Sequence, residues 1–98
     1  SVESLHPYGA LENATFKLEA PVPAKFVRVH FAQLSTEANF DFVTLSDAKG
    51  VEGFRISGEA KDIWSDYLDG SDIQVTLTSD PSVQGWGFRI DQLQYVPR

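Results

Sequence analysis

Hydrophobic residues in this chain recur at every second position, and no long segment shows the spacing of three and four that an α-helix requires. The clearest run places Ile73, Val75 and Leu77 on one face and glutamine and threonine side chains on the other. Similar alternation occurs in the segments 15–19, 26–31, 40–46 and 86–95. Strands of this kind bury one face each, so the sequence predicts an all-β fold with antiparallel strands.

Turn-forming residues separate these runs at short intervals. They are Pro21 and Pro23, the segment 47–50, the pair Asp69-Gly70, and the pair Asp80-Pro81. Many short strands at this spacing are typical of a β-sandwich of the jelly-roll type. A chain of 98 residues supports one hydrophobic core, so we expect a single domain over residues 1–98. Only the segment 61–67 is compatible with one helical turn.

Composition excludes several classes of function. The net charge of −6 opposes binding to nucleic acids or to anionic membranes and favours metal ions or a lysine-rich protein. The chain has no cysteine, which excludes disulfides, zinc-thiolate sites and a cysteine nucleophile. No apolar run is long enough to span a membrane.

Catalysis has little support in the sequence. His6 and His30 are the only histidines, and neither lies in a His-Glu-x-x-His arrangement. No Gly-x-Ser-x-Gly motif is present. His30 lies inside a predicted strand, where a surface or packing role is the more common one. We therefore expect a binding or stabilising module and not an enzyme.

Acidic residues near the predicted loops point to a metal site. Glu37 and Asp41 come just before one strand, and Asp80 comes just after another. If these loops meet, two carboxylates about 4 Å apart repel by roughly 4 kcal/mol at an effective dielectric of 20, so a shared cation is favoured. Calcium suits such oxygen ligands, and the amide of Gln33 is a further candidate. The alternative is that each carboxylate is a separately solvated turn residue.

Three sequence motifs resemble the CUB domain family. The segment 31–43 contains the aromatic-Asp-aromatic-Val run Phe40-Asp41-Phe42-Val43, and the segment 73–82 ends in a Ser-Asp-x-Ser loop that precedes Gly87-Phe88. The opening residues 3–8 are similar to a cysteine-free branch found as C-terminal modules of secreted bacterial and archaeal proteases. The resemblance covers nearly the whole chain.

This resemblance implies a calcium site. Asp41 and Asp80 match two of the family's calcium ligands, whereas the upstream acidic position corresponds either to Glu37 or to Gln33. Backbone carbonyls of Ser82 and Val83 are further candidate ligands, and Glu3 and Asp47 are more remote candidates. Because the family's usual cysteines are missing, packing of four aromatic residues is expected to replace the cross-links: Phe40, Phe42, Trp86 and Phe88.

The resemblance also implies a function and a location. It suggests a calcium-binding accessory domain of a secreted protease, which stabilises the parent protein, mediates binding of a protein substrate or basic partner, or does both. The parent catalytic domain is the expected partner within the chain. A start at Ser1 without methionine is expected for a module cut from a longer precursor. The alternative is an extracellular carbohydrate-binding module in which Trp64 and Tyr67 form an aromatic platform for sugar or peptide. In the contrary interpretation the two rings simply close one end of the sandwich.

Overall fold

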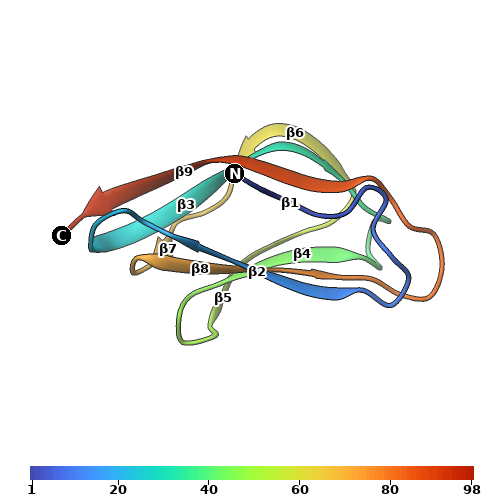
Figure 1. Ribbon diagram of the computed structural model, residues 1–98, viewed down its shortest axis with the longest axis horizontal. Coiled ribbons are helices and arrows are strands. Elements are labelled where there is room, and N and C mark those ends of the chain that lie inside the picture. Colours follow the sequence, from blue (N-terminus) through green and yellow to red (C-terminus); the bar gives the residue numbers. More distant parts are fainter.

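The computed structural model describes residues 1–98 and consists of strands and loops without a helix (Figure 1). The strands are β1 (Val2–Glu3), β2 (Asn13–Glu19), β3 (Ala24–Ser35), β4 (Phe42–Ser46), β5 (Glu52–Ile56), β6 (Glu59–Trp64), β7 (Leu68–Asp69), β8 (Asp72–Thr78) and β9 (Gly87–Pro97). They form two antiparallel sheets that face each other, so the predicted β-sandwich is confirmed. No segment forms a helix of the length and apolarity needed to cross a membrane.

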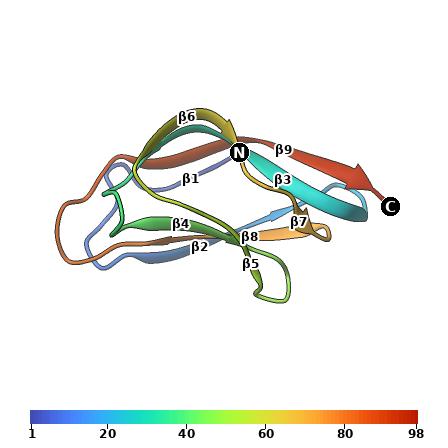
Figure 2. The same ribbon diagram turned by 180° about the vertical axis from the view of Figure 1, so that it is seen from behind.

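The strand order brings distant loops to the same end of the sandwich. One sheet has the order β1-β9-β3-β6 with β7 also paired to β3, and the other has the order β2-β8-β4-β5 (Figure 2). The chain crosses between the sheets from β3 to β4 and from β8 to β9. Ser35 pairs with Gly87, and Phe42 pairs with Thr78. The β3–β4 loop therefore begins where the β8–β9 loop ends, and it ends where the β8–β9 loop begins.

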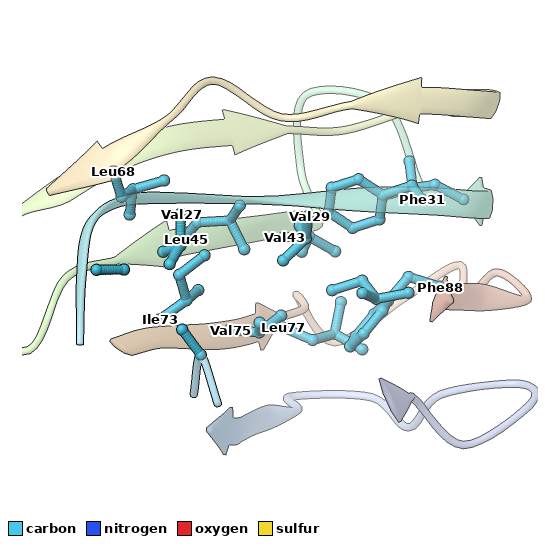
Figure 3. Close-up of a cluster of buried hydrophobic side chains, with 14 of the residues drawn as sticks. Val27, Val29, Phe31, Val43, Leu45, Leu68, Ile73, Val75, Leu77 and Phe88 are labelled. Carbon is cyan, nitrogen blue, oxygen red and sulfur yellow. The ribbon is translucent and has the colours of Figure 1, made fainter. Parts of the chain in front are cut away.

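The core lies between the sheets and consists of 15 buried hydrophobic residues. In Figure 3, Val27, Val29 and Phe31 of β3 point toward side chains of the opposite sheet, which include Val43, Leu45, Ile73, Val75 and Leu77. Because side chains alternate between the faces of a strand, the period-two pattern of the sequence gives each strand one buried face. The core thus follows directly from the alternation.

The structure differs from the sequence analysis in two local features. The segment 61–67, which was compatible with one helical turn, forms no helix, and its residues up to Trp64 belong to β6, an edge strand in which Asp62 has a left-handed backbone with φ of 53°. Of the four aromatic residues expected to replace the cross-links, only Phe88 is fully buried, whereas Phe40 is 62 % exposed. Phe31 and Tyr8 supply the other fully buried aromatic rings. Phe40 lies in a turn before β4, so the strand alternation does not bury it.

Candidate metal centre

Three loops meet at one end of the sandwich, on the right in Figure 1, where backbone hydrogen bonds join two of them and side chains join the third. They are the β1–β2 connection, the β3–β4 loop and the β8–β9 loop. The N–H of Leu11 donates to the carbonyl of Asp80 at 3.0 Å, and the N–H of Tyr8 donates to the carbonyl of Gly85 at 3.3 Å. Residues from distant parts of the sequence are therefore fixed beside one another.

The β3–β4 loop holds Glu37 and Asp41 in one tight turn. The N–H groups of Phe40 and Asp41 both donate to the carbonyl of Glu37, at 3.3 and 3.0 Å. The hydroxyl of Thr36 donates to the carbonyl of Asp41 at 3.0 Å and accepts from the N–H of Gly58 at 2.9 Å. These bonds satisfy the backbone of the turn and bring both acidic residues to the same side of it.

Asp41 is completely buried, and its carboxylate connects all three loops. Its Oδ2 accepts from the Tyr8 hydroxyl at 2.6 Å, and its Oδ1 accepts from the N–H of Asp80 at 2.9 Å. The Tyr8 oxygen also accepts from the N–H of Glu37 at 3.2 Å. Burial and the bond to Asp41 raise the pKa of Tyr8, which keeps the proton on the phenol. The carboxylate of Asp41 is thus held by two donors.

The side chains of Glu37, Asp41 and Asp80 gather at this point. One carboxylate oxygen of each lies within 4.8 Å of the others, and none of the three carboxylates forms an ion pair with a lysine or arginine. Glu37 Oε1 is buried and has no hydrogen-bond partner. Burial, followed by the negative charges of Asp80 and Asp41, raises the pKa of Glu37. The cluster therefore combines electrostatic repulsion with an unsatisfied buried acceptor.

A hard divalent cation fits this arrangement chemically. Two oxygens bound to the same calcium at about 2.3–2.6 Å lie at most about 5 Å apart, which is compatible with the separation of 4.8 Å. The ligand atoms are all oxygens, as calcium prefers, and no cysteine or histidine joins them. The sequence-based expectation that Glu37, Asp41 and Asp80 converge is met by the geometry.

The other candidate ligands lie in different positions. Gln33 lies inside β3 opposite Lys61 and Arg89, and the upstream acidic position in the cluster is taken by Glu37. Ser82 belongs to the same loop as Asp80, and its N–H donates to Asp80 Oδ1 at 3.2 Å. Val83 lines the same cavity as Glu37. Glu3 contacts His6 instead, and Asp47 accepts hydrogen bonds from N–H groups of its own turn.

Arg28 lies against one face of Trp64 and of Tyr67. The guanidinium carbon of Arg28 lies 4.5 Å from the centroid of Trp64 and 4.8 Å from that of Tyr67. Arg28 Nε donates to Gln94 at 2.7 Å, which fixes the cation between the rings. Each cation–π contact covers one face of a ring, and a sugar cannot stack on that face. The two aromatic residues therefore hold an arginine on the outer face of the sheet.

His30, Asp91 and Asp62 form a second cluster of titratable groups, which the sequence did not predict. The imidazole of His30 is buried, with Nδ1 2.6 Å from Asp91 and Nε2 2.6 Å from Asp62. A protonated imidazole has a donor at each ring nitrogen, so this arrangement favours the protonated form of His30. Bonds to Asp91 and Asp62 raise the pKa of His30, and His30 in turn lowers the pKa of Asp91. The partners lie 61 and 32 residues away, so no local motif signals the contact.

These pKa shifts predict how stability depends on pH. The stability that His30 contributes is fully present below its ordinary pKa of 6.5 and is lost as the pH rises through the raised pKa of the folded state. The stability that Asp91 contributes is present above its ordinary pKa of 3.8 and is lost as the pH falls through the lowered pKa of the folded state. We expect an NMR titration of the His30 ring to give a pKa above 6.5, and the stability difference between wild type and His30→Gln to shrink at alkaline pH. A ring that titrates at or below 6.5 contradicts this account.

The fold and the site together define a β-sandwich with a cluster of carboxylates between its loops. The similarity of the chain to known proteins is limited. No family model matches the chain. It is 33 % identical over 102 residues to the E3 ubiquitin-protein ligase HERC2 of Homo sapiens and, equally, to that of Mus musculus. The match covers 98 % of this chain but only 2 % of each of these relatives.

Proposed function

We propose that this chain is a non-catalytic calcium-binding module of a longer protein. The observation that carries the proposal is the buried, unpartnered Oε1 of Glu37, which lies in a cluster with Asp41 and Asp80. A buried acceptor without a donor is costly, and so is a group of like charges at this distance. One calcium ion removes both costs at the same time.

The role of the ion follows from the loops that it joins. Glu37 and Asp41 belong to the β3–β4 loop and Asp80 to the β8–β9 loop, while Tyr8 attaches the N-terminal segment to Asp41. An ion bound by all three carboxylates crosslinks these segments in the folded state only. Calcium therefore stabilises the fold by the linkage between ligand binding and folding.

The proposed context is an accessory domain of a secreted protease, where the module contacts the parent catalytic domain and binds a basic side chain of a protein substrate or partner. The resemblance to cysteine-free CUB modules supports this context. The similarity to a segment that makes up 2 % of a ubiquitin ligase supports a module within a longer chain. Carbohydrate binding has less support, because Arg28 lies against both Trp64 and Tyr67.

Thermal unfolding with and without calcium tests this function. Extracellular calcium modules bind at about 10⁻⁴–10⁻³ M, and a concentration of one hundred times the Kd adds about 2.7 kcal/mol of stability. For a domain of this size that increment raises the Tm by roughly 10–20 °C. We expect this rise when EDTA is replaced by saturating CaCl₂, as measured by circular dichroism.

The matched control is Asp66→Asn, which removes an exposed carboxylate outside the cluster. This variant should show the same calcium-induced rise as the wild type, because it leaves Glu37, Asp41 and Asp80 unchanged. Equal melting temperatures of the wild type in EDTA and in saturating CaCl₂ would reject the proposed function.

A further inference from the structure

A cavity of about 330 Å³ lies across strand β3, between β6 and the start of β9. It is lined by residues 33–35 of β3, residues 59–61 of β6, and Trp86, which directly precedes β9. Because β3 lies between β9 and β6 in the sheet, its residues form the floor, and β6 and Trp86 form the two sides. This volume is at the lower end of the range for ligand pockets, about 300–1,000 Å³, so it suits a single small ring.

The indole of Trp86 is held in place before any ligand arrives. The ring of His6 stacks on it, with a centroid distance of 3.8 Å and an angle of 11° between the planes. His6 Nδ1 donates to the carbonyl of Trp86 at 2.6 Å, and His6 Nε2 lies 2.8 Å from Glu3 Oε2. His6 does not line the cavity, so it covers one face of the indole and leaves the other side of the ring to the cavity. A ring fixed in this way loses little conformational freedom on binding.

Polar side chains of both signs surround the cavity. Glu59 and Lys61 are two residues apart in β6 and pair with Ser35 and Gln33 of β3, so all four lie on the same face of the sheet. Neither Glu59 nor Lys61 forms an ion pair, and Glu59 accepts only a long hydrogen bond of 3.5 Å from the Ser35 hydroxyl. The cavity therefore offers a carboxylate that accepts, an ammonium that donates and an amide that does both.

We propose that this cavity binds a neutral pyranose sugar. The ring of such a sugar has an apolar C–H face that stacks on Trp86, and its hydroxyls both donate and accept hydrogen bonds. Glu59 accepts from one hydroxyl and Lys61 donates to another. An anionic ligand is repelled by Glu59 and a cationic ligand by Lys61, so an uncharged ligand is the one that meets no like charge.

This cavity is separate from the other sites of the molecule. Arg28 lies against Trp64 and Tyr67 and disfavours a sugar there, whereas no arginine or lysine lies over the ring of Trp86. None of the three carboxylates of the candidate metal centre lines the cavity. Sugar binding consequently does not depend on calcium and should occur in EDTA.

An NMR titration of the wild-type chain in EDTA tests the proposal, with the methyl glycosides of glucose, galactose, mannose and N-acetylglucosamine as probes. A ligand of this size binds with a Kd of about 1 mM, so each is added to about 20 mM. The chain has two tryptophans and therefore two indole N–H signals. We expect the signal of Trp86 to shift saturably with at least one glycoside and that of Trp64 to stay unchanged. Glycerol at the same concentration, which has hydroxyls but no ring, should produce no saturable shift.

Two variants remove different parts of the site. Trp86→Leu removes the stacking face and should abolish binding, as read from the backbone amide signal of Ser35. Lys61→Ala removes one donor from an exposed position of an edge strand and should raise the Kd by about two- to tenfold. The matched control is Lys49→Ala, which removes an exposed lysine from the β4–β5 turn and should leave the Kd unchanged.

Three results would overturn the proposal. One is the absence of a saturable shift of the Trp86 signal with all four glycosides. Another is an equal shift of the Trp64 and Trp86 signals, which places the sugar elsewhere or shows unspecific contact. The third is a Kd that stays unchanged in both Trp86→Leu and Lys61→Ala.

Discussion

Asp41→Ala is expected to lower the free energy of unfolding by about 2–4 kcal/mol even in EDTA, because each buried polar group left without a partner costs about 1–3 kcal/mol. The substitution deprives the Tyr8 hydroxyl and the Asp80 N–H of their acceptor. Relief of repulsion with Glu37 offsets part of this loss. Chemical denaturation in EDTA measures the change, and the same variant in CaCl₂ should show little further stabilisation.

Tyr8→Phe is the matched variant for this prediction. It removes the hydrogen bond to Asp41 and the one that the Tyr8 oxygen accepts from the N–H of Glu37, but leaves all three carboxylates and the Asp80 N–H bond in place. It should therefore also lose stability in EDTA, but unlike Asp41→Ala it should keep the calcium-induced increment. If Asp41→Ala is as stable as the wild type in EDTA, the proposed role of Asp41 in joining the loops is wrong.

Glu37→Gln is expected to change stability in opposite directions with and without calcium. Because the pKa of Glu37 is raised, stability from its protonated form is present below its ordinary value of 4.5 and is lost as the pH rises through the folded-state value. At neutral pH in EDTA, a neutral glutamine removes the buried charge and should raise the Tm. In CaCl₂ the variant lacks a carboxylate ligand, so most of the calcium increment of about 2.7 kcal/mol should disappear.

Gln33→Ala is the control that separates the two candidate upstream positions. Gln33 lies in β3 and outside the carboxylate cluster, so this variant should keep the calcium increment of the wild type. If Gln33→Ala loses the increment and Glu37→Gln keeps it, the ligand assignment is reversed. Comparing the two melting curves in EDTA and in CaCl₂ decides between them.

The sandwich was predictable from the sequence because its strands bury alternate residues. Ile73, Val75 and Leu77 are all fully buried, as their alternation requires. The edge strand β6 was not predictable in the same way, since its mixture of charged and apolar residues has no clear period. Asp62 interrupts it with a left-handed backbone, and its carboxylate is committed to His30. Edge strands make fewer packing demands on their sequence, so their pattern is weaker.

The candidate site was predictable only in part. The convergence of Asp41 with Asp80 was expected only on the condition that their loops meet, and the resemblance to the CUB family supported that condition. The choice between Gln33 and Glu37 depends on irregularities of β3, which has register shifts next to Phe31. A bulge changes which residues face a given direction, and the sequence has no local signal for it. The contact of Tyr8 with Asp41 joins residues 33 positions apart, and it was missed because no local sequence pattern marks it.

The most direct measurement is a calcium titration followed in amide NMR spectra of the wild-type chain. The account predicts one saturable transition, with a Kd of about 10⁻⁴–10⁻³ M, in which the amide signals of Glu37, Asp80 and Ser82 shift most. Signals from the opposite end of the sandwich, such as that of Asp69, should stay unchanged. Shifts that are absent, that fail to saturate, or that centre on Asp69 contradict the proposed calcium site.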